Sequence, residues 1–258
     1  MSALFKQARQ TRILTAIREQ GQVAVSELSR NCDVSEVTIR RDLRELAEQG
    51  LLRRAHGGAL LSVANVPEHP VIQRMAAGHS WKEAIGRAAA VLVADGESVF
   101  IGSGSTTAYV ARHLADHQHV TVVTNALNVA SELAAAQGVA VVVTGGMMRP
   151  AELSLIGHIT EQALREVRVD KVIIGMRAIS LEAGLTNDYL PEVMTDRTIL
   201  GMAPVLILVA DHTKFGQVAS AYVAPLDQVT TLVTDSGTPP QAIARLRRLG
   251  IEIVVAQA

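Results

Sequence analysis

Residues 98–107, with the sequence Ser-Val-Phe-Ile-Gly-Ser-Gly-Ser-Thr-Thr, join a short apolar run to a segment of small and hydroxyl-bearing residues. A pattern typical of a helix follows and continues to Leu114. Glycines let backbone amides approach an anion, hydroxyls add hydrogen-bond donors, and the start of a helix adds partial positive charge. The stretch therefore predicts a buried strand, an anion-binding loop and a helix in succession.

The same alternation of strand and helix continues through the rest of the chain. Apolar runs separated by amphipathic segments indicate an α/β fold with a parallel sheet and helices on both of its faces. In such sheets ligands bind beyond the carboxyl ends of the strands. The expected strands are residues 98–102, 120–125, 139–146, 170–175, 204–211, 228–235 and 251–256.

Small, polar or charged residues follow five of these strands. One such strand end is usually no more than a helix cap, so Ser105 or Thr106 alone carries little weight. Five together favour a binding site for a small anion, with lysine or arginine balancing its charge. The candidate effector-binding residues are Gly102, Ser103, Gly104, Ser105, Thr106, Thr107, Thr124, Asn125, Gly145, Gly146, Arg149, Arg177, Asp211 and Lys214.

The loop after residue 101 is not one of the common nucleotide-binding motifs. The P-loop pattern GxxxxGK[ST] is absent, and the third glycine of the dinucleotide fingerprint is missing. The sequence therefore indicates an anion of another kind, and no cofactor or metal is expected.

Residues 35–50, Ser-Glu-Val-Thr-Ile-Arg-Arg-Asp-Leu-Arg-Glu-Leu-Ala-Glu-Gln-Gly, predict a second kind of unit. Ser35 is expected to cap a helix whose Ile39, Leu43 and Leu46 pack against earlier helices. At about 100° per residue, other side chains fall on the free face of this helix. That face carries Val37, Arg41 and Arg44, with Thr38 and Arg40 at its flanks.

A shorter helix, capped by Ser26, and a tight turn precede this helix, and together they fit a helix-turn-helix. The arginine-bearing face would enter the major groove of DNA, where arginine hydrogen-bonds guanine. Residues 51–61 follow as two apolar pairs around a basic Gly-Gly turn, which predicts a two-stranded wing. In that wing Arg53, Arg54 and His56 could approach phosphates or the minor groove.

Ion pairs on the helix surface are the alternative explanation for its arginines. The capped helix, the arginine face and the basic wing occur together, however, and residues 1–57 carry ten Lys and Arg against seven Asp and Glu. DNA binding is therefore the stronger interpretation. The alternative pairs would join Arg40 and Arg41 with Glu36, Glu45 or Glu48.

Residues 62–73 contain two prolines and little periodic pattern, which predicts an extended linker. We therefore expect a DNA-binding domain at residues 1–61 and an effector-binding α/β domain at residues 74–258. A helix is expected over residues 74–93, at the start of the second domain.

Composition limits the remaining possibilities. The single cysteine, Cys32, excludes an internal disulfide and a multi-cysteine zinc site. No apolar run reaches the roughly eighteen residues of a membrane span, and the N-terminus lacks the apolar stretch of a signal peptide. A soluble cytoplasmic protein without membrane contact is expected.

The stretch from Ser35 to Leu60 resembles the winged helix-turn-helix signature of the DeoR family of bacterial transcriptional regulators. The resemblance implies that Ser35, Thr38, Arg40 and Arg41 contact DNA, and that Asp42 holds an arginine in place. The similarity covers Ser35, Thr38, Ile39, Arg40, Arg41, Asp42, Leu43, Leu46, Gly50, the basic pair Arg53 and Arg54, Gly57 and Gly58.

The second half resembles the effector domain of the same family, which is related in fold to ribose-5-phosphate isomerase, an enzyme with a similar phosphate loop. This resemblance implies a sensor of a phosphorylated sugar or related metabolite, which releases the protein from its operator. The matching segments are IGSGSTT at 101–107, TNALNVA at 124–130, VTGGMMRP at 143–150, DKVIIG at 170–175, GLTND at 184–188 and VADHTKFG at 209–216.

One departure from the family pattern concerns the segment after the strand at 170–175. Family members commonly show Gly-Ala-Asp-Gly there, and the isomerases carry catalytic carboxylates in that region, whereas this chain has Gly175-Met176-Arg177-Ala178. Proton abstraction from a sugar needs a positioned base, usually a carboxylate. The arginine therefore argues against isomerase catalysis. Asp188, Glu192 and Asp196 are near in sequence, but no pattern directs them inward.

We therefore expect a DNA-binding regulator without catalytic residues, a repressor of a carbohydrate catabolic operon that a phosphorylated sugar releases from double-stranded operator DNA. The alternative is a sugar-phosphate isomerase-like enzyme with an accessory DNA-binding domain. A homo-oligomer, either a dimer or a tetramer, is expected because linking two DNA-binding units raises the affinity for paired sites.

Overall fold

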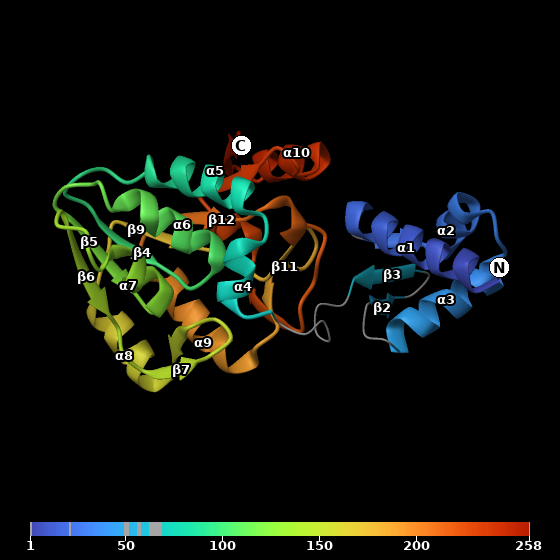
Figure 1. Ribbon diagram of the computed structural model, residues 1–258, viewed down its shortest axis with the longest axis horizontal. Helices are drawn as coiled ribbons and strands as arrows, with labels where there is room; N and C mark the ends of the chain where they lie inside the picture. The colour runs from blue at the N-terminus through green and yellow to red at the C-terminus, as the bar shows by residue number, and fades with distance from the viewer. Residues whose placement is uncertain (1, 21, 49–51, 56–57, 62–68, 258) are drawn as a thin grey trace.

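The computed structural model describes residues 2–20, 22–48, 52–55, 58–61 and 69–257. In Figure 1 the elements before residue 62 form one body and the elements from residue 71 onward form another. None of the described helices has the length and hydropathy needed to cross a bilayer.

The first body combines three helices with a three-stranded antiparallel sheet of order β1-β3-β2. Ile13, Leu28 and Ile39 come from the three different helices and are fully buried at their centre. Three helices followed by a hairpin match the predicted winged helix-turn-helix. Its elements are α1 (Ser2–Gln20), β1 (Gln22–Ala24), α2 (Val25–Cys32), α3 (Glu36–Glu48), β2 (Leu52–Ala55) and β3 (Gly58–Leu61).

Two expected helix boundaries are wrong. α2 begins at Val25, and its flanking residue Ala24 provides no side-chain cap, so Ser26 lies inside the helix. The helix expected over residues 74–93 is two helices, α4 (Val71–Ala76) and α5 (His79–Ala90). Gly78 separates them with a φ of 66°, a left-handed conformation that glycine adopts without strain.

The second body is built on the predicted parallel sheet, which has seven strands in the order β15-β14-β12-β9-β4-β5-β6. Every neighbouring pair in it is parallel. The strands are β4 (Ser98–Ile101), β5 (Val120–Thr124), β6 (Val139–Val143), β9 (Lys171–Ile174), β12 (Val205–Val209), β14 (Thr231–Asp235) and β15 (Glu252–Ala256).

Helices cover both faces of this sheet because successive strand side chains point in opposite directions. Val99 and Ile101 pack on the side of α5, α6 (Ser105–Leu114) and α7 (Leu127–Leu133). Phe100, which lies between them, packs on the side that α8, α9 and α10 cover. These last helices span His158–Glu166, Leu190–Leu200 and Pro240–Arg248.

Short antiparallel strands, which the apolar pattern did not predict, lie at the carboxyl edge of the sheet. β7 (Met147–Arg149) pairs with β8 (Ser154–Ile156). β10 (Ala178–Ser180), β11 (Gly184–Asn187) and β13 (Ala221–Ala224) form a separate sheet. The chain leaves β4 toward β5 and β6 and then returns to place β9 on the other side of β4. Such a reversal opens a crevice at the strand ends, where ligands bind in this class of fold.

Candidate functional site

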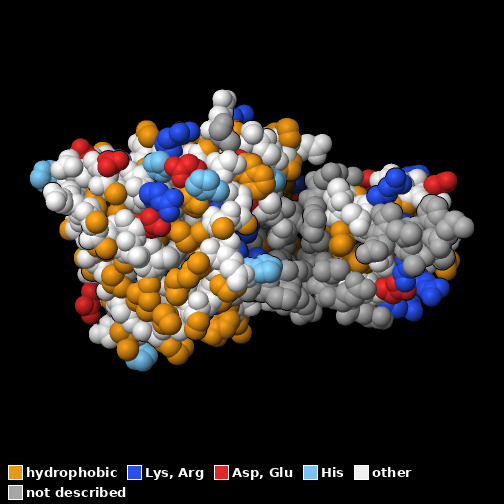
Figure 2. Space-filling model, viewed as in Figure 1, with side chains coloured by type: hydrophobic (Ala, Val, Ile, Leu, Met, Phe, Trp, Pro, Cys, Tyr) orange, Lys and Arg blue, Asp and Glu red, His pale blue; other side chains and the backbone are white. Residues whose placement is uncertain are grey.

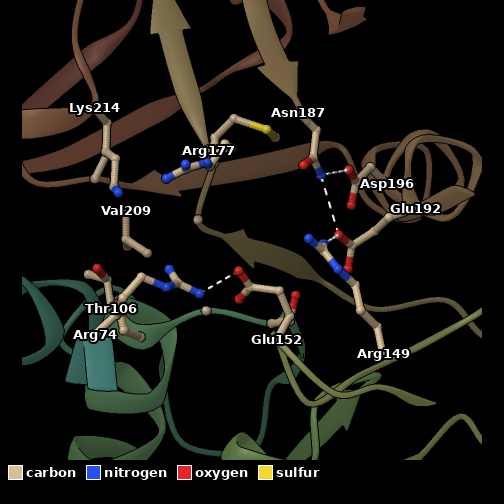
Figure 3. A pocket seen from close by; sticks show the side chains of 16 residues that line it. Arg74, Thr106, Arg149, Glu152, Arg177, Asn187, Glu192, Asp196, Val209 and Lys214 are labelled. Atoms are coloured by element: carbon tan, nitrogen blue, oxygen red, sulfur yellow. Dashed lines mark hydrogen bonds and ion pairs between the residues drawn. The ribbon is translucent and has the colours of Figure 1, made fainter. Parts of the chain in front are cut away.

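An open pocket lies at this reversal, beyond the carboxyl ends of β4 and β9 (Figure 3). The loop between β4 and α6 forms one wall, and α9 forms the wall opposite. The lining residues are Arg74, Ser103, Gly104, Ser105, Thr106, Arg149, Glu152, Gly175, Met176, Arg177, Asn187, Glu192, Asp196, Val209, Ala210 and Lys214.

The start of α6 presents backbone donors to this pocket. Gly104 precedes the helix with a φ of 144°, a conformation that favours glycine, and no side chain caps the helix at this residue. The first N–H groups of a helix have no partner within the helix, and the helix dipole adds partial positive charge. The predicted anion-binding loop therefore has the geometry that anion binding requires.

Two basic side chains of the pocket are each held by a carboxylate. Arg74 of α4 forms an ion pair with Glu152, and Arg149 of β7 forms one with Glu192 of α9, as Figure 3 shows. The Arg149 guanidinium also lies over the Tyr189 ring, 4.3 Å from its centroid. These contacts fix both arginines and offset part of their charge.

Arg177 and Lys214 lie on the other side of the pocket. Arg177 Nε donates a hydrogen bond to Asp188 Oδ2 at 2.8 Å. The Lys214 ammonium group forms no hydrogen bond or ion pair with any described residue, and only the backbone N–H of Lys214 is engaged, by the Asp211 carbonyl at 3.1 Å. Burial lowers the pKa of the Lys214 ammonium group, although the nearby Asp211 carboxylate opposes this change. An enclosed cation without a carboxylate partner gains most from a bound anion.

Carboxyl groups on α9 occupy the opposite wall. The Glu192 side chain is buried and accepts a hydrogen bond from Ser154 Oγ at 2.7 Å. Asp196 lies one helical turn later and accepts a hydrogen bond from Asn187 Nδ2 at 2.8 Å. Burial, with a further contribution from the Glu192 charge, raises the pKa of Asp196 to about 8. Asp196 therefore carries a proton near neutral pH.

Seven of the predicted effector residues line this pocket. Glu192 and Asp196, which no sequence pattern directed inward, also line the pocket, and their spacing of four residues puts them on one face of α9. Arg74, Glu152 and Asn187 were not predicted as site residues, because they come from segments that only the folded chain brings together. The seven are Ser103, Gly104, Ser105, Thr106, Arg149, Arg177 and Lys214.

Other predicted residues support the walls instead of lining them. The hydroxyls of Thr107 and Thr124 donate to backbone carbonyls of the β4–α6 region, at 3.1 and 2.6 Å. Asp211 accepts a hydrogen bond at 2.9 Å from the backbone of the 3₁₀ turn His212–Lys214. These three side chains keep the strand ends in position.

The remaining predicted residues lie at two other places. Gly102 and Asn125 line a small cavity that adjoins the main pocket, and Ser103 and Asp196 line both. Gly145 and Gly146 are outside the lining; the hydroxyl of Thr160 donates to the Gly145 carbonyl at 2.7 Å.

In the first body, α3 has the predicted cap and buried face. Ser35 Oγ accepts a hydrogen bond from the Thr38 backbone N–H at 3.3 Å. Ile39 and Leu43 are buried, whereas Val37 on the opposite face is 73% exposed. The helix therefore presents its free face to solvent, as a major-groove helix must.

The arginines of this free face form exposed contacts. Arg40 pairs with Glu36 at 2.7 Å, and Arg41 lies 3.6 Å from Glu45. Arg44 is exposed and has no ion pair among the described residues. Exposed pairs of this kind contribute about 0.3–0.5 kcal/mol, so the guanidinium groups can exchange their partner for DNA.

Asp42 has the supporting role that the family resemblance implied. Its side chain is 2% exposed and accepts a hydrogen bond from Arg9 Nε at 2.5 Å, which ties α1 to α3. In the predicted wing, Arg53 and Arg54 lie on β2, which pairs with β3. His56 lies outside the described residues.

Comparison with solved structures gives weak similarities. Ribose 5-phosphate isomerase A from Neisseria gonorrhoeae aligns with a TM-score of 0.39 and 16% identity over 52% of each chain. At that level the alignment indicates nothing about activity.

Sequence comparison gives much stronger matches along the whole chain. The putative aga operon transcriptional repressor of Escherichia coli O157:H7 is 34% identical, with 96% of this chain and 93% of that protein covered. The glycerol-3-phosphate regulon repressor of Escherichia coli K12 is 36% identical, with 90% and 91% covered. The transcriptional repressor CsqR of the same organism is 35% identical, with 100% and 98% covered.

Two family models match consecutive parts of the chain. The DeoR-like helix-turn-helix domain matches residues 9–63, and the DeoR C terminal sensor domain matches residues 78–236. The first match contains α3 and its exposed arginines, and the second contains most of the pocket lining. Both matches and the full-length relatives agree: the chain belongs to the DeoR family of DNA-binding transcriptional regulators, and is not an enzyme of the isomerase class.

Proposed function

We propose that this protein represses a carbohydrate catabolic operon in the cytoplasm and is released from its operator by a phosphorylated sugar or polyol. The phosphate would bind at the start of α6, against Lys214. The observation that carries this proposal is the meeting of uncapped helix N–H groups with a lysine that has no carboxylate partner among the described residues. An effector with a phosphoryl group supplies the missing negative charge.

Operator binding is assigned to the free face of α3. Val37, Thr38, Arg41 and Arg44 would face the major groove, with Ser35 and Arg40 near the phosphates. The relatives support repression, since the aga operon and glycerol-3-phosphate regulon proteins are named as repressors.

We also propose that the protein acts as a homo-oligomer. Figure 2 shows apolar side chains gathered on one side of the large body, over the region of α7, β7 and α9. We call this surface the apolar face. A soluble monomer rarely exposes so many large apolar side chains together, and a second copy would cover them. We assign to it the exposed large apolar residues of these elements and of α8, namely Leu127, Met147, Met148, Ile159, Leu190 and Met194, which are 36%, 63%, 46%, 54%, 70% and 55% exposed.

The test pairs two variants that separate DNA binding from effector binding. The duplex that the purified protein selects from a random library serves as operator in fluorescence anisotropy, and phosphorylated sugars are screened by thermal shift. Arg41→Ala should lose operator binding and keep ligand-induced stabilisation. Ser105→Asp places a negative charge at the phosphate position. This variant should keep operator binding, but no phosphorylated sugar should stabilise it or release it from the operator. If the sugar that releases the wild-type protein from the operator also releases Ser105→Asp at the same concentration, the proposed effector site is contradicted.

A further inference from the structure

We infer that the α9 wall of the pocket selects an uncharged, hydroxyl-bearing end of the effector and rejects a carboxylate there, through Asp196. This inference rests on the proposed phosphate site and concerns the part of the ligand that extends from it. Phosphorylated alditols and neutral sugars would then be effectors, and phosphorylated sugar acids would not.

The two ends of the ligand site are close together and chemically opposite. Ser103, at the α6 end, and Asp196, on α9, line the same small adjoining cavity as well as the main pocket. A phosphate held near Ser103 therefore places the next few carbon atoms of a ligand beside Asp196. Figure 3 shows the carboxyl groups of α9 across the pocket from Lys214.

Of the two carboxyl groups on α9, the hydrogen-bond network leaves that of Asp196 able to hydrogen-bond a ligand. Both Glu192 oxygens are engaged, Oε1 by Ser154 at 2.7 Å and Oε2 by Arg149. Asp196 Oδ2 accepts from Asn187, whereas its Oδ1 has no hydrogen-bond partner among the described residues. A ligand hydroxyl can fill this position, because a hydroxyl both donates and accepts.

Asn187 is fixed by its own contacts and cannot reverse its amide to suit an anion. Its Oδ1 accepts hydrogen bonds from the backbone N–H groups of Asp188 and Tyr189, at 2.8 and 3.4 Å. The Nδ2 group is therefore directed toward the Asp196 and Glu192 carboxyls, at 2.8 and 3.5 Å. The Asn187 amide is therefore already in use and does not bind a ligand carboxylate.

The charged groups around Asp196 also disfavour a ligand carboxylate. Glu192 of α9 and Glu152 of the β7–β8 turn are the acidic neighbours, and Arg149 of β7 is the basic one, already paired with Glu192. Burial and Glu192 raise the pKa of Asp196, so this wall already disfavours a further negative charge. A ligand carboxylate would be a third negative charge beside Glu192 and Glu152, and like-charge repulsion disfavours it.

The experiment uses three phosphate esters with one three-carbon skeleton. Glycerol 3-phosphate carries two hydroxyls, propyl phosphate carries none, and 3-phosphoglycerate replaces the terminal hydroxymethyl group by a carboxylate. Calorimetric titration of the full-length protein at pH 7 should show glycerol 3-phosphate binding at least about tenfold more tightly than either of the others, the ratio that one well-placed hydrogen bond or one like-charge contact produces.

Two variants test whether Asp196 causes this preference. Asp196→Ala should reduce the preference for glycerol 3-phosphate over propyl phosphate to less than about threefold, with propyl phosphate affinity unchanged. Asp196→Asn keeps the shape and hydrogen bonding of the side chain, and it should retain that preference. Asp227→Asn, in an exposed turn outside the pocket, is the matched control and should behave like the wild-type protein.

The outcomes separate this inference from the proposed function. Equal binding of propyl phosphate and glycerol 3-phosphate, or of 3-phosphoglycerate and glycerol 3-phosphate, overturns the inference while the phosphate site stands. An unchanged preference in Asp196→Ala removes Asp196 from the role. If inorganic phosphate and all three esters fail to bind even at tens of millimolar, the phosphate site itself is wrong, and this inference fails with it.

Discussion

Arg177 Nε lies 2.8 Å from Asp188 Oδ2, so the arginine that departs from the family pattern is paired with a carboxylate eleven residues later. Its charge is partly neutralised before any ligand arrives. Asp188 Oδ1 is buried without a partner among the described residues, which makes Arg177 its main support. Arg177 therefore shapes the pocket wall, and Lys214 remains the cation available for phosphate.

Loss of Lys214 should weaken effector binding without affecting DNA. Lys214→Met keeps the aliphatic stem and removes the charge that would face the phosphate, so the affinity for inorganic phosphate and for phosphorylated sugars should fall at least about tenfold. Calorimetric titration gives the affinity, and fluorescence anisotropy gives operator binding, which should be unchanged. Lys6→Met removes an exposed lysine of the first body and serves as control. Equal phosphate affinity of Lys214→Met and wild type would falsify the assignment.

The Arg177–Asp188 pair should show strong coupling in a double-mutant cycle. Arg177→Ala leaves the largely buried Asp188 carboxylate without its cation, and this should lower the free energy of unfolding by about 2 kcal/mol. Replacing both residues by alanine should cost less than the sum of the single changes, with a coupling of about 1 kcal/mol. Urea denaturation of the four proteins measures these values. Additive single changes would show that the two side chains act independently.

Much of the fold could be predicted from the sequence because its signals are local. The seven parallel strands are apolar runs, and the cap of α3 is formed by a serine three residues before its partner, Thr38. The broken helix at Gly78 was missed because its alanine-rich surroundings continue the helical pattern across the glycine. Here a positive φ, which no periodicity reveals, decides the structure.

The pocket was predictable only on the side built by consecutive residues. Ser103 to Thr106 follow directly after a buried strand, where a binding loop is expected. Arg74 and Glu152 are seventy-eight residues apart and meet as an ion pair only in the folded chain. Glu192 and Asp196 were noticed in the sequence, but their inward direction depends on which face of α9 packs against the sheet.

Breaking the buried pair in the first body should loosen the DNA-binding unit. Asp42→Ala leaves the Arg9 guanidinium, which is 19% exposed, without its carboxylate, and should destabilise this unit by about 3 kcal/mol. Hydrogen exchange measured peptide by peptide should therefore accelerate in α1 and α3 while α6 stays protected. Glu36→Ala breaks the exposed pair with Arg40 and should change the exchange rates little. Protection of α1 equal to that of the wild type would contradict this role of Asp42.

The pH dependence of stability should carry the signature of Asp196. The folded state holds its proton up to about pH 8, whereas the unfolded chain loses it near 3.8. Between these values the folded state binds more protons, so this group makes the free energy of unfolding decrease as pH rises from about 4 to about 8. The midpoint temperature of thermal unfolding should decrease more steeply between pH 5 and pH 8 for the wild-type protein than for Asp196→Asn. Identical slopes would show that Asp196 ionises normally in the fold.

α9 should link effector binding to oligomerisation, because one of its faces lines the pocket and the other is part of the apolar face. Glu192 and Asp196 point into the pocket, while Leu190 and Met194 lie on the apolar face. Met194→Lys should yield monomers in sedimentation velocity and weaken operator binding at least about tenfold, while phosphate affinity stays the same. Val91→Lys, at an exposed valine outside the apolar face, is the matched control. If Met194→Lys sediments as the wild type does, the copies associate through another surface and α9 has no part in linking them.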